Sequence, residues 1–101
     1  MQEQEVRKIV LQYIIDWHDK WGRLFDTSSL WIYWNQHYNP GMERGENIAD
    51  DIMFVISATL LDLVSKGILV PKLGYQGFST REFQINHYDL LVKCKQSLEN
   101  G

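Results

Sequence analysis

The chain has 101 residues, of which 45% are hydrophobic and 13% aromatic, and its net charge is −3. This length predicts a single domain, 1–101, that buries a core without disulfides or metals, and the apolar content excludes a disordered chain. Residues 1–66 carry six Lys or Arg and ten Asp or Glu, a balance of −4, whereas residues 67–101 carry four and three, a balance of +1. That distribution is not the basic footprint of a protein that neutralises many phosphates.

The cysteine content and the apolar runs indicate a compartment. Cys94 is the single cysteine, so no internal disulfide can form and a reducing compartment is expected. The first residues, MQEQEVRK, lack the apolar segment of a signal peptide. The longest apolar runs, 30–34 and 52–56, are far too short to span a membrane. We therefore expect a soluble, cytoplasmic protein with no membrane partner.

The first predicted element is a helix from Glu3 to Trp21. Glu3 and Glu5 suit the positive end of its dipole, Lys20 suits the negative end, and Gly22 is a natural C-cap. Its apolar residues recur at helical spacing: Val6, Ile9, Val10, Tyr13, Ile14, Trp17 and Trp21.

A second helix is predicted from Ser28 to Tyr38. A cluster of N-cap residues, 26–29, precedes the run LWIYWNQHY (30–38), and Asn39-Pro40-Gly41 ends the helix. Such a helix places Leu30, Trp31, Trp34 and Tyr38 on roughly one face. The run LWIYW (30–34) is also compatible with a strand, so both alternatives stay open.

A third helix is predicted from Asn47 to Lys66, where Gly67 stops it. A strand over 68–70, a loop over 72–80, a second strand over 81–85 and a last helix from His87 to Glu99 follow. Phe83 and Ile85 face one way on the second strand. The expected inner face of the third helix is Ile48, Ile52, Ile56, Thr59, Leu60 and Leu63, and the last helix has a stripe of Leu91, Cys94 and Leu98.

This order of elements and the run SATLLDLVSKGILV (57–70) resemble the winged-helix superfamily, in which a third helix with paired leucines ends at a Lys/Glu-Gly step before an apolar strand and a hairpin wing. The resemblance implies an α+β, mostly helical fold with three helices, a β-hairpin wing and a C-terminal helix. In DNA-binding members the third helix enters the major groove. Carried over, this places Asn47, Asp50, Asp51, Phe54, Ser57, Ala58 and Leu61 toward the duplex.

The charge of the third helix contradicts a DNA-reading role. No Lys or Arg occurs between Gly45 and Ser65, whereas Glu46, Asp50, Asp51 and Asp62 are acidic. At 100° per residue, the side opposite the core stripe carries Phe54, Ala58 and Leu61, flanked by Asp51 and Asp62. Either a partner or a second copy covers this side, or the N-terminal helix or the run 30–34 covers it within the monomer.

Two further groups of residues are candidates for binding. Tyr33 and His37 fall away from the Trp34 face, and exposed aromatic residues are preferred anchors of protein interfaces. The nucleic-acid alternative uses the wing, where Lys72 and Arg81 can reach phosphates and Tyr75 and Phe78 can stack on a sugar or base.

No catalytic or metal-binding motif is present. His18, His37 and His87 stand in no metal-ligand spacing, and no nucleophile elbow, phosphate loop or paired-carboxylate motif occurs. We therefore expect no enzyme, metal, cofactor or small-molecule substrate. The leading hypothesis is a winged-helix-like module that binds another protein or itself through helix three and neighbouring aromatics. The alternative is a DNA-binding regulator that uses the wing and a dimer.

Overall fold

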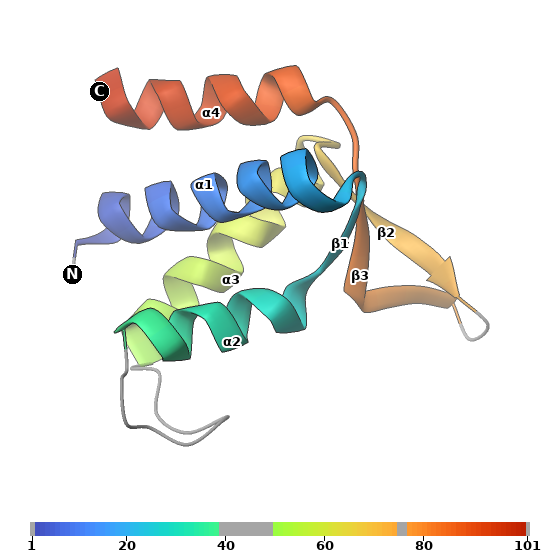
Figure 1. The fold of residues 1–101 in the computed structure, drawn as a ribbon, viewed down its shortest axis with the longest axis horizontal. Coiled ribbons are helices and arrows are strands. Elements are labelled where there is room, and N and C mark those ends of the chain that lie inside the picture. The colour runs from blue at the N-terminus through green and yellow to red at the C-terminus, as the bar shows by residue number, and fades with distance from the viewer. Residues whose placement is uncertain (1, 39–49, 75–76, 101) are drawn as a thin grey trace.

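The computed structural model describes residues 2–38, 50–74 and 77–100, which form an α+β, mostly helical fold (Figure 1). The helices α1 and α4 lie side by side, α3 crosses behind α1, and the sheet stands at one end of the helices (Figure 1). In chain order the elements are α1 (Glu3–Trp21), β1 (Leu24–Asp26), α2 (Thr27–Tyr38), α3 (Asp50–Ser65), β2 (Leu69–Gly74), β3 (Gly77–Ile85) and α4 (Tyr88–Asn100).

The sheet is antiparallel, with β3 in the middle and the strand order β1-β3-β2. Phe83 of β3 is opposite Phe25 of β1 on one side and Pro71 of β2 on the other. The register of β2 shifts between Pro71 and Leu73. Proline has no N–H to donate, and it is tolerated here because β2 is an edge strand.

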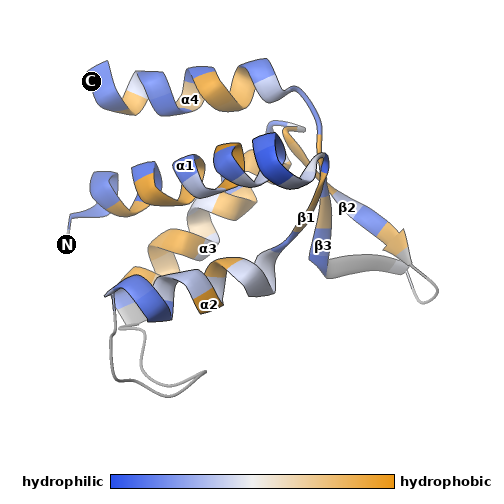
Figure 2. Ribbon diagram, in the orientation of Figure 1, coloured by the Kyte–Doolittle hydropathy of each residue, from blue (hydrophilic) through white to orange (hydrophobic). Residues whose placement is uncertain are grey.

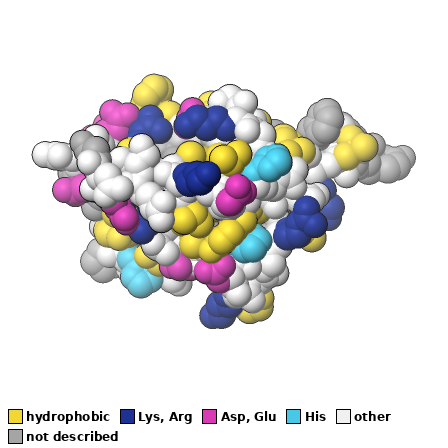
Figure 3. Space-filling view, turned by 90° about the horizontal axis from the view of Figure 1, so that it is seen from above, with side chains coloured by type: hydrophobic (Ala, Val, Ile, Leu, Met, Phe, Trp, Pro, Cys, Tyr) yellow, Lys and Arg dark blue, Asp and Glu magenta, His cyan; other side chains and the backbone are white. Residues whose placement is uncertain are grey.

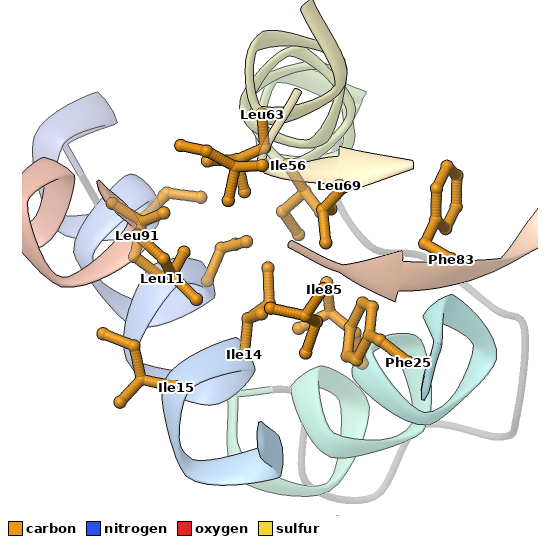
Figure 4. Close-up of a cluster of buried hydrophobic side chains, with 14 of the residues drawn as sticks. Leu11, Ile14, Ile15, Phe25, Ile56, Leu63, Leu69, Phe83, Ile85 and Leu91 are labelled. Carbon is orange, nitrogen blue, oxygen red and sulfur yellow. The ribbon is translucent and has the colours of Figure 1, made fainter. Parts of the chain in front are cut away.

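The core lies where α1, α3, α4 and the sheet meet (Figure 4). Figure 2 shows that α1 and α4 alternate between apolar and polar residues along their length, whereas α3 is apolar over most of its length. Ile14 and Ile85 fill the space between α1 and the sheet, and Trp34 anchors α2. The other buried apolar residues are Val6, Val10, Leu11, Ile15, Phe25, Leu30, Ile56, Leu63, Ile68, Leu69, Phe83 and Leu91.

Two glycines end helices with the positive φ that a glycine adopts without strain. Gly22 follows α1 with φ +93° and donates its N–H to His18. Gly67 follows α3 with φ +73° and donates its N–H to the carbonyl of Val64, while Ile68 donates its N–H to the carbonyl of Leu63. This pair of hydrogen bonds is a Schellman motif, and it turns the chain directly into β2.

Most sequence-based predictions of helices are confirmed. The bounds of α1 are those predicted, and α4 begins and ends one residue later than expected. The run 30–34 is helical, so the strand alternative for it is wrong. Phe83 and Ile85 both point into the core, as expected. The predicted start of the third helix, 47–49, lies outside the described residues.

The predictions for the sheet need correction. The loop predicted over 72–80 is largely strand, because β2 continues to Gly74 and β3 begins at Gly77. Backbone pairing across an antiparallel hairpin extends both strands, whatever side chains they carry. The strand β1 was not predicted at all.

None of the helices in the described parts of the chain has the length and hydropathy that crossing a membrane requires.

Candidate functional site

In the part of the chain that the structure describes, the outer face of α3 carries large apolar side chains that are mostly exposed. Phe54 is 74% exposed and Leu61 is 68% exposed. On the opposite side of the same helix, Ile56 and Leu63 are buried in the core. The expectation that the N-terminal helix or the run 30–34 covers Phe54 and Leu61 is therefore wrong. α1 packs on the inner side of α3 instead.

Four residues lie in a row along this outer face, and we call them the seam: Phe54, Ala58, Leu61 and Ser65. The intervals alternate between four and three residues, which is the pattern of a helix that packs along another helix. Ala58 at its middle is half buried and small. Helices approach each other most closely where the side chains between them are small.

Charged residues flank one side of the seam. Asp51 and Asp62 are exposed, and Lys66 Nζ lies 2.9 Å from Asp62 Oδ2. The hydrogen bond that Lys66 donates to Asp62 raises the pKa of Lys66, so its ammonium group stays protonated at neutral pH. The flank is thus acidic at the start of α3 and basic just beyond its end.

Tyr33 and His37 belong to a different surface. Their rings are 4.4 Å apart between centroids, and Tyr33 also lies 4.6 Å from the ring of Tyr13 on α1. The two residues therefore join α1 and α2, and the structure does not bring them together with the seam on α3. Tyr13 belongs to the apolar spacing predicted for α1, and its contact with Tyr33 was not predicted.

The wing residues have partners within the chain. Lys72 Nζ is 3.6 Å from Glu82 Oε2, and Arg81 Nε is 3.3 Å from Asp26 Oδ1. Each cation would have to share its charge between a carboxylate and a phosphate. Tyr75 and the side chain of Phe78 lie outside the described residues.

One face of the molecule shows how the cations are distributed there. On the face seen in Figure 3, Lys and Arg side chains are separated by acidic and apolar ones. A surface that tracks a phosphate backbone needs cations in a continuous stripe. The view shows no such stripe.

In the described part of the chain, Cys94 and His18 have structural contacts. No group of three His, Cys, Asp or Glu side chains there could hold a metal ion. Cys94 is half buried on α4, where it packs against the core and lines a cavity with Arg7 and Lys66. His18 stacks on Tyr88 with ring centroids 4.3 Å apart, which ties α1 to α4.

Comparison with family models, with curated proteins and with solved structures found no match for this chain.

Proposed function

We propose that this chain is a non-enzymatic, winged-helix-like binding module that associates with a second copy of itself through the outer face of α3. The observation that carries the proposal is the exposure of Phe54 and Leu61 on one helical seam. Large side chains that remain exposed on one face usually mark a surface that binds a partner.

The winged-helix part of the proposal is supported by the order of the elements. Three helices are followed by the β2–β3 hairpin and by α4, and the short strand β1 completes the sheet. In such a fold α3 would be the helix offered to a ligand. Here that helix offers apolar and acidic side chains, which suit a protein surface better than a phosphate backbone.

Charge complementarity supports a second copy as the partner. In a two-fold dimer the same patch meets itself, so the patch must be self-complementary. When two α3 helices pack antiparallel with the axis beside Ala58, Asp51 of one copy faces Lys66 of the other. The sum of 51 and 66 places their midpoint within one residue of Ala58. Two such ion pairs then close the ends of the apolar seam.

The size of the surface indicates a weak association. One helix of 16 residues presents less than a standard interface of about 800 Å² per partner. We therefore expect a dissociation constant in the micromolar range or above, so that the dimer forms and separates with concentration.

A charge exchange tests both the partner and the orientation by sedimentation equilibrium. Asp51→Lys places two ammonium groups opposite each other and should weaken the dimer. The double variant Asp51→Lys with Lys66→Glu should restore it, because the ion pairs then form in the opposite sense. Glu5→Lys, the same charge change on an exposed part of α1, is the matched control and should leave association unchanged.

Two results would overturn the proposal. If the unaltered protein stays monomeric at all accessible concentrations, the seam does not bind a second copy. If the double variant associates no better than Asp51→Lys alone, the two helices are not antiparallel.

A further inference from the structure

A groove between α1 and α2, which we call the tyrosine groove, is distinct from the seam on α3. It encloses about 360 Å³. This volume is within the range of pockets that hold small organic groups. The residues that line it are Ile9, Gln12, Tyr13, Asp16, Tyr33 and Tyr38.

The three tyrosine rings of the groove form a connected cluster. Tyr13 and Tyr33 are inclined at 35° with centroids 4.6 Å apart. Tyr38 meets Tyr33 edge to face at 6.4 Å, and it also packs against the buried Trp34 at 4.5 Å. Trp34 thus fixes Tyr38, at one wall of the groove, to the core.

The charge of the groove is negative. Asp16 supplies a carboxylate at the wall, and Gln12 Nε2 holds its Oδ1 at 2.7 Å. Burial, together with Tyr33, raises the pKa of Tyr38, so its phenol is neutral at physiological pH. None of the described lining residues is Lys or Arg.

Ring faces beside a carboxylate attract a cation. The negative face of an aromatic ring stabilises a positive charge placed over it. The same molecule already shows this contact near the end of α1, where Lys20 Nζ lies 5.3 Å from the ring centroid of Trp21. The tyrosine groove offers more ring surface and a carboxylate as well, without a cation from its own described lining.

We propose that the tyrosine groove binds an arginine side chain presented by a protein ligand. A guanidinium group is planar, so it can stack on a ring while its N–H groups donate to a carboxylate. A lysine ammonium group satisfies only the charge, because it is compact and strongly hydrated. The proposal does not depend on the association through α3, which uses a different face.

The test titrates the protein with N-acetyl-arginine amide and follows the tyrosine ring resonances by NMR. Binding should be saturable with a millimolar dissociation constant, since one side chain makes few contacts. N-acetyl-citrulline amide, which has nearly the same shape but no charge, should not bind. N-acetyl-lysine amide should bind more weakly than the arginine probe.

Two variants locate the binding. Asp16→Asn should weaken it about 3- to 10-fold, as expected for the loss of a partly exposed ion pair with its hydrogen bonds. Tyr33→Leu should abolish it. Asp19→Asn removes the same charge from α1 at a residue outside the groove, and it should bind the probe as the unaltered protein does.

The proposal is overturned if the arginine probe does not bind, or if citrulline binds equally well. It is also overturned if Asp16→Asn binds arginine with unchanged affinity. That variant changes an exposed side chain, so it keeps the comparison valid even if Tyr33→Leu fails to fold. Equal affinity for the lysine probe would refute the assignment to arginine.

Discussion

Replacement of Phe54 or Leu61 by lysine should abolish self-association and leave the fold intact. Both side chains are mostly exposed in the monomer, at 74% and 68%, so neither contributes much to the core. A lysine at either position can extend into water in the monomer. In a dimer it would have to be buried in an apolar seam, where a charge is costly.

The magnitude follows from the exposed fractions. Burying an entire side chain of this size contributes about 1.5–3 kcal/mol, so covering the exposed part contributes roughly 1–2 kcal/mol. A two-fold dimer contains two copies of each residue, so one substitution removes about 2–4 kcal/mol. The dissociation constant should therefore rise by about 30- to 700-fold, before any cost of burying the charge.

Light scattering across a concentration series measures association, and thermal unfolding measures the fold. Leu73→Lys is the matched control, because Leu73 is 69% exposed but lies on β2, away from α3. The control should associate normally. If Phe54→Lys or Leu61→Lys lowers the melting temperature sharply, the two residues stabilise the monomer, and their assignment to self-association is refuted. Unchanged association would show that the seam carries no function.

Three other outcomes are expected. Gly67→Val should lower the free energy of unfolding by about 1–3 kcal/mol, because φ is +73° there and strains a residue with a side chain. No neighbouring atom would crowd a Cβ, so the cost would come from the backbone alone, and an unchanged urea midpoint would argue against strain. Asp26→Ala should cost about 1–2 kcal/mol in urea unfolding, since Asp26 Oδ1 caps α2 by accepting from the N–H of Ser28 at 2.8 Å. Burial raises the pKa of Asp26, but hydrogen bonds from Ser28 and Arg81 outweigh this effect and hold the pKa below that of an unfolded aspartate. The carboxylate therefore stabilises the fold at pH values above the unfolded pKa, and this stabilisation is lost as the pH falls through the lower folded pKa. The difference in unfolding free energy between the unaltered protein and Asp26→Ala should narrow on acidification, and a constant difference would contradict the assignment. Duplex DNA should bind with a dissociation constant above about 1 µM at physiological salt and with steep salt dependence, measured by fluorescence anisotropy; a sequence-specific nanomolar complex would support the regulator alternative instead.

The helices could be predicted because their information is local. The apolar spacing of α1 runs unbroken to its last turn and Gly22 marks its end, so its bounds follow from the sequence. The burial of single residues follows less well. Trp21 continues the apolar stripe of α1, yet it is 64% exposed, whereas Trp17 one turn earlier packs against the core.

The strands could be predicted only in part because their partners are distant. β1 has three residues, and Leu24 is paired with Gln84, which is 60 positions further along the chain. No local sequence pattern predicts such a distant contact. Gly77 indicates a loop, and only its pairing with Gly74 of β2 makes it part of a strand.

The seam on α3 and the tyrosine groove also differ in how far the sequence predicts them. The seam on α3 lies within one helix, so a helical wheel places Phe54 and Leu61 correctly opposite the core. The tyrosine groove needs two helices at once. Tyr13 repeats with the core residues of α1, and only the position of α2 shows that its ring also meets Tyr33.

The central position of β3 has a consequence for the order of events during synthesis. β1 and β2 both leave the ribosome before the strand that pairs them, and α1 appears long before the α4 helix that packs along it. Ile85 donates its N–H to the carbonyl of Arg23, and Asn86 donates to the carbonyl of Ile68, so the end of the last strand connects two separate parts of the chain. Until then, two strand edges and an apolar helix face stay open to other molecules. A ribosome that stalls before residue 77 would therefore hold an aggregation-prone chain, and folding should finish only after α4 has been released.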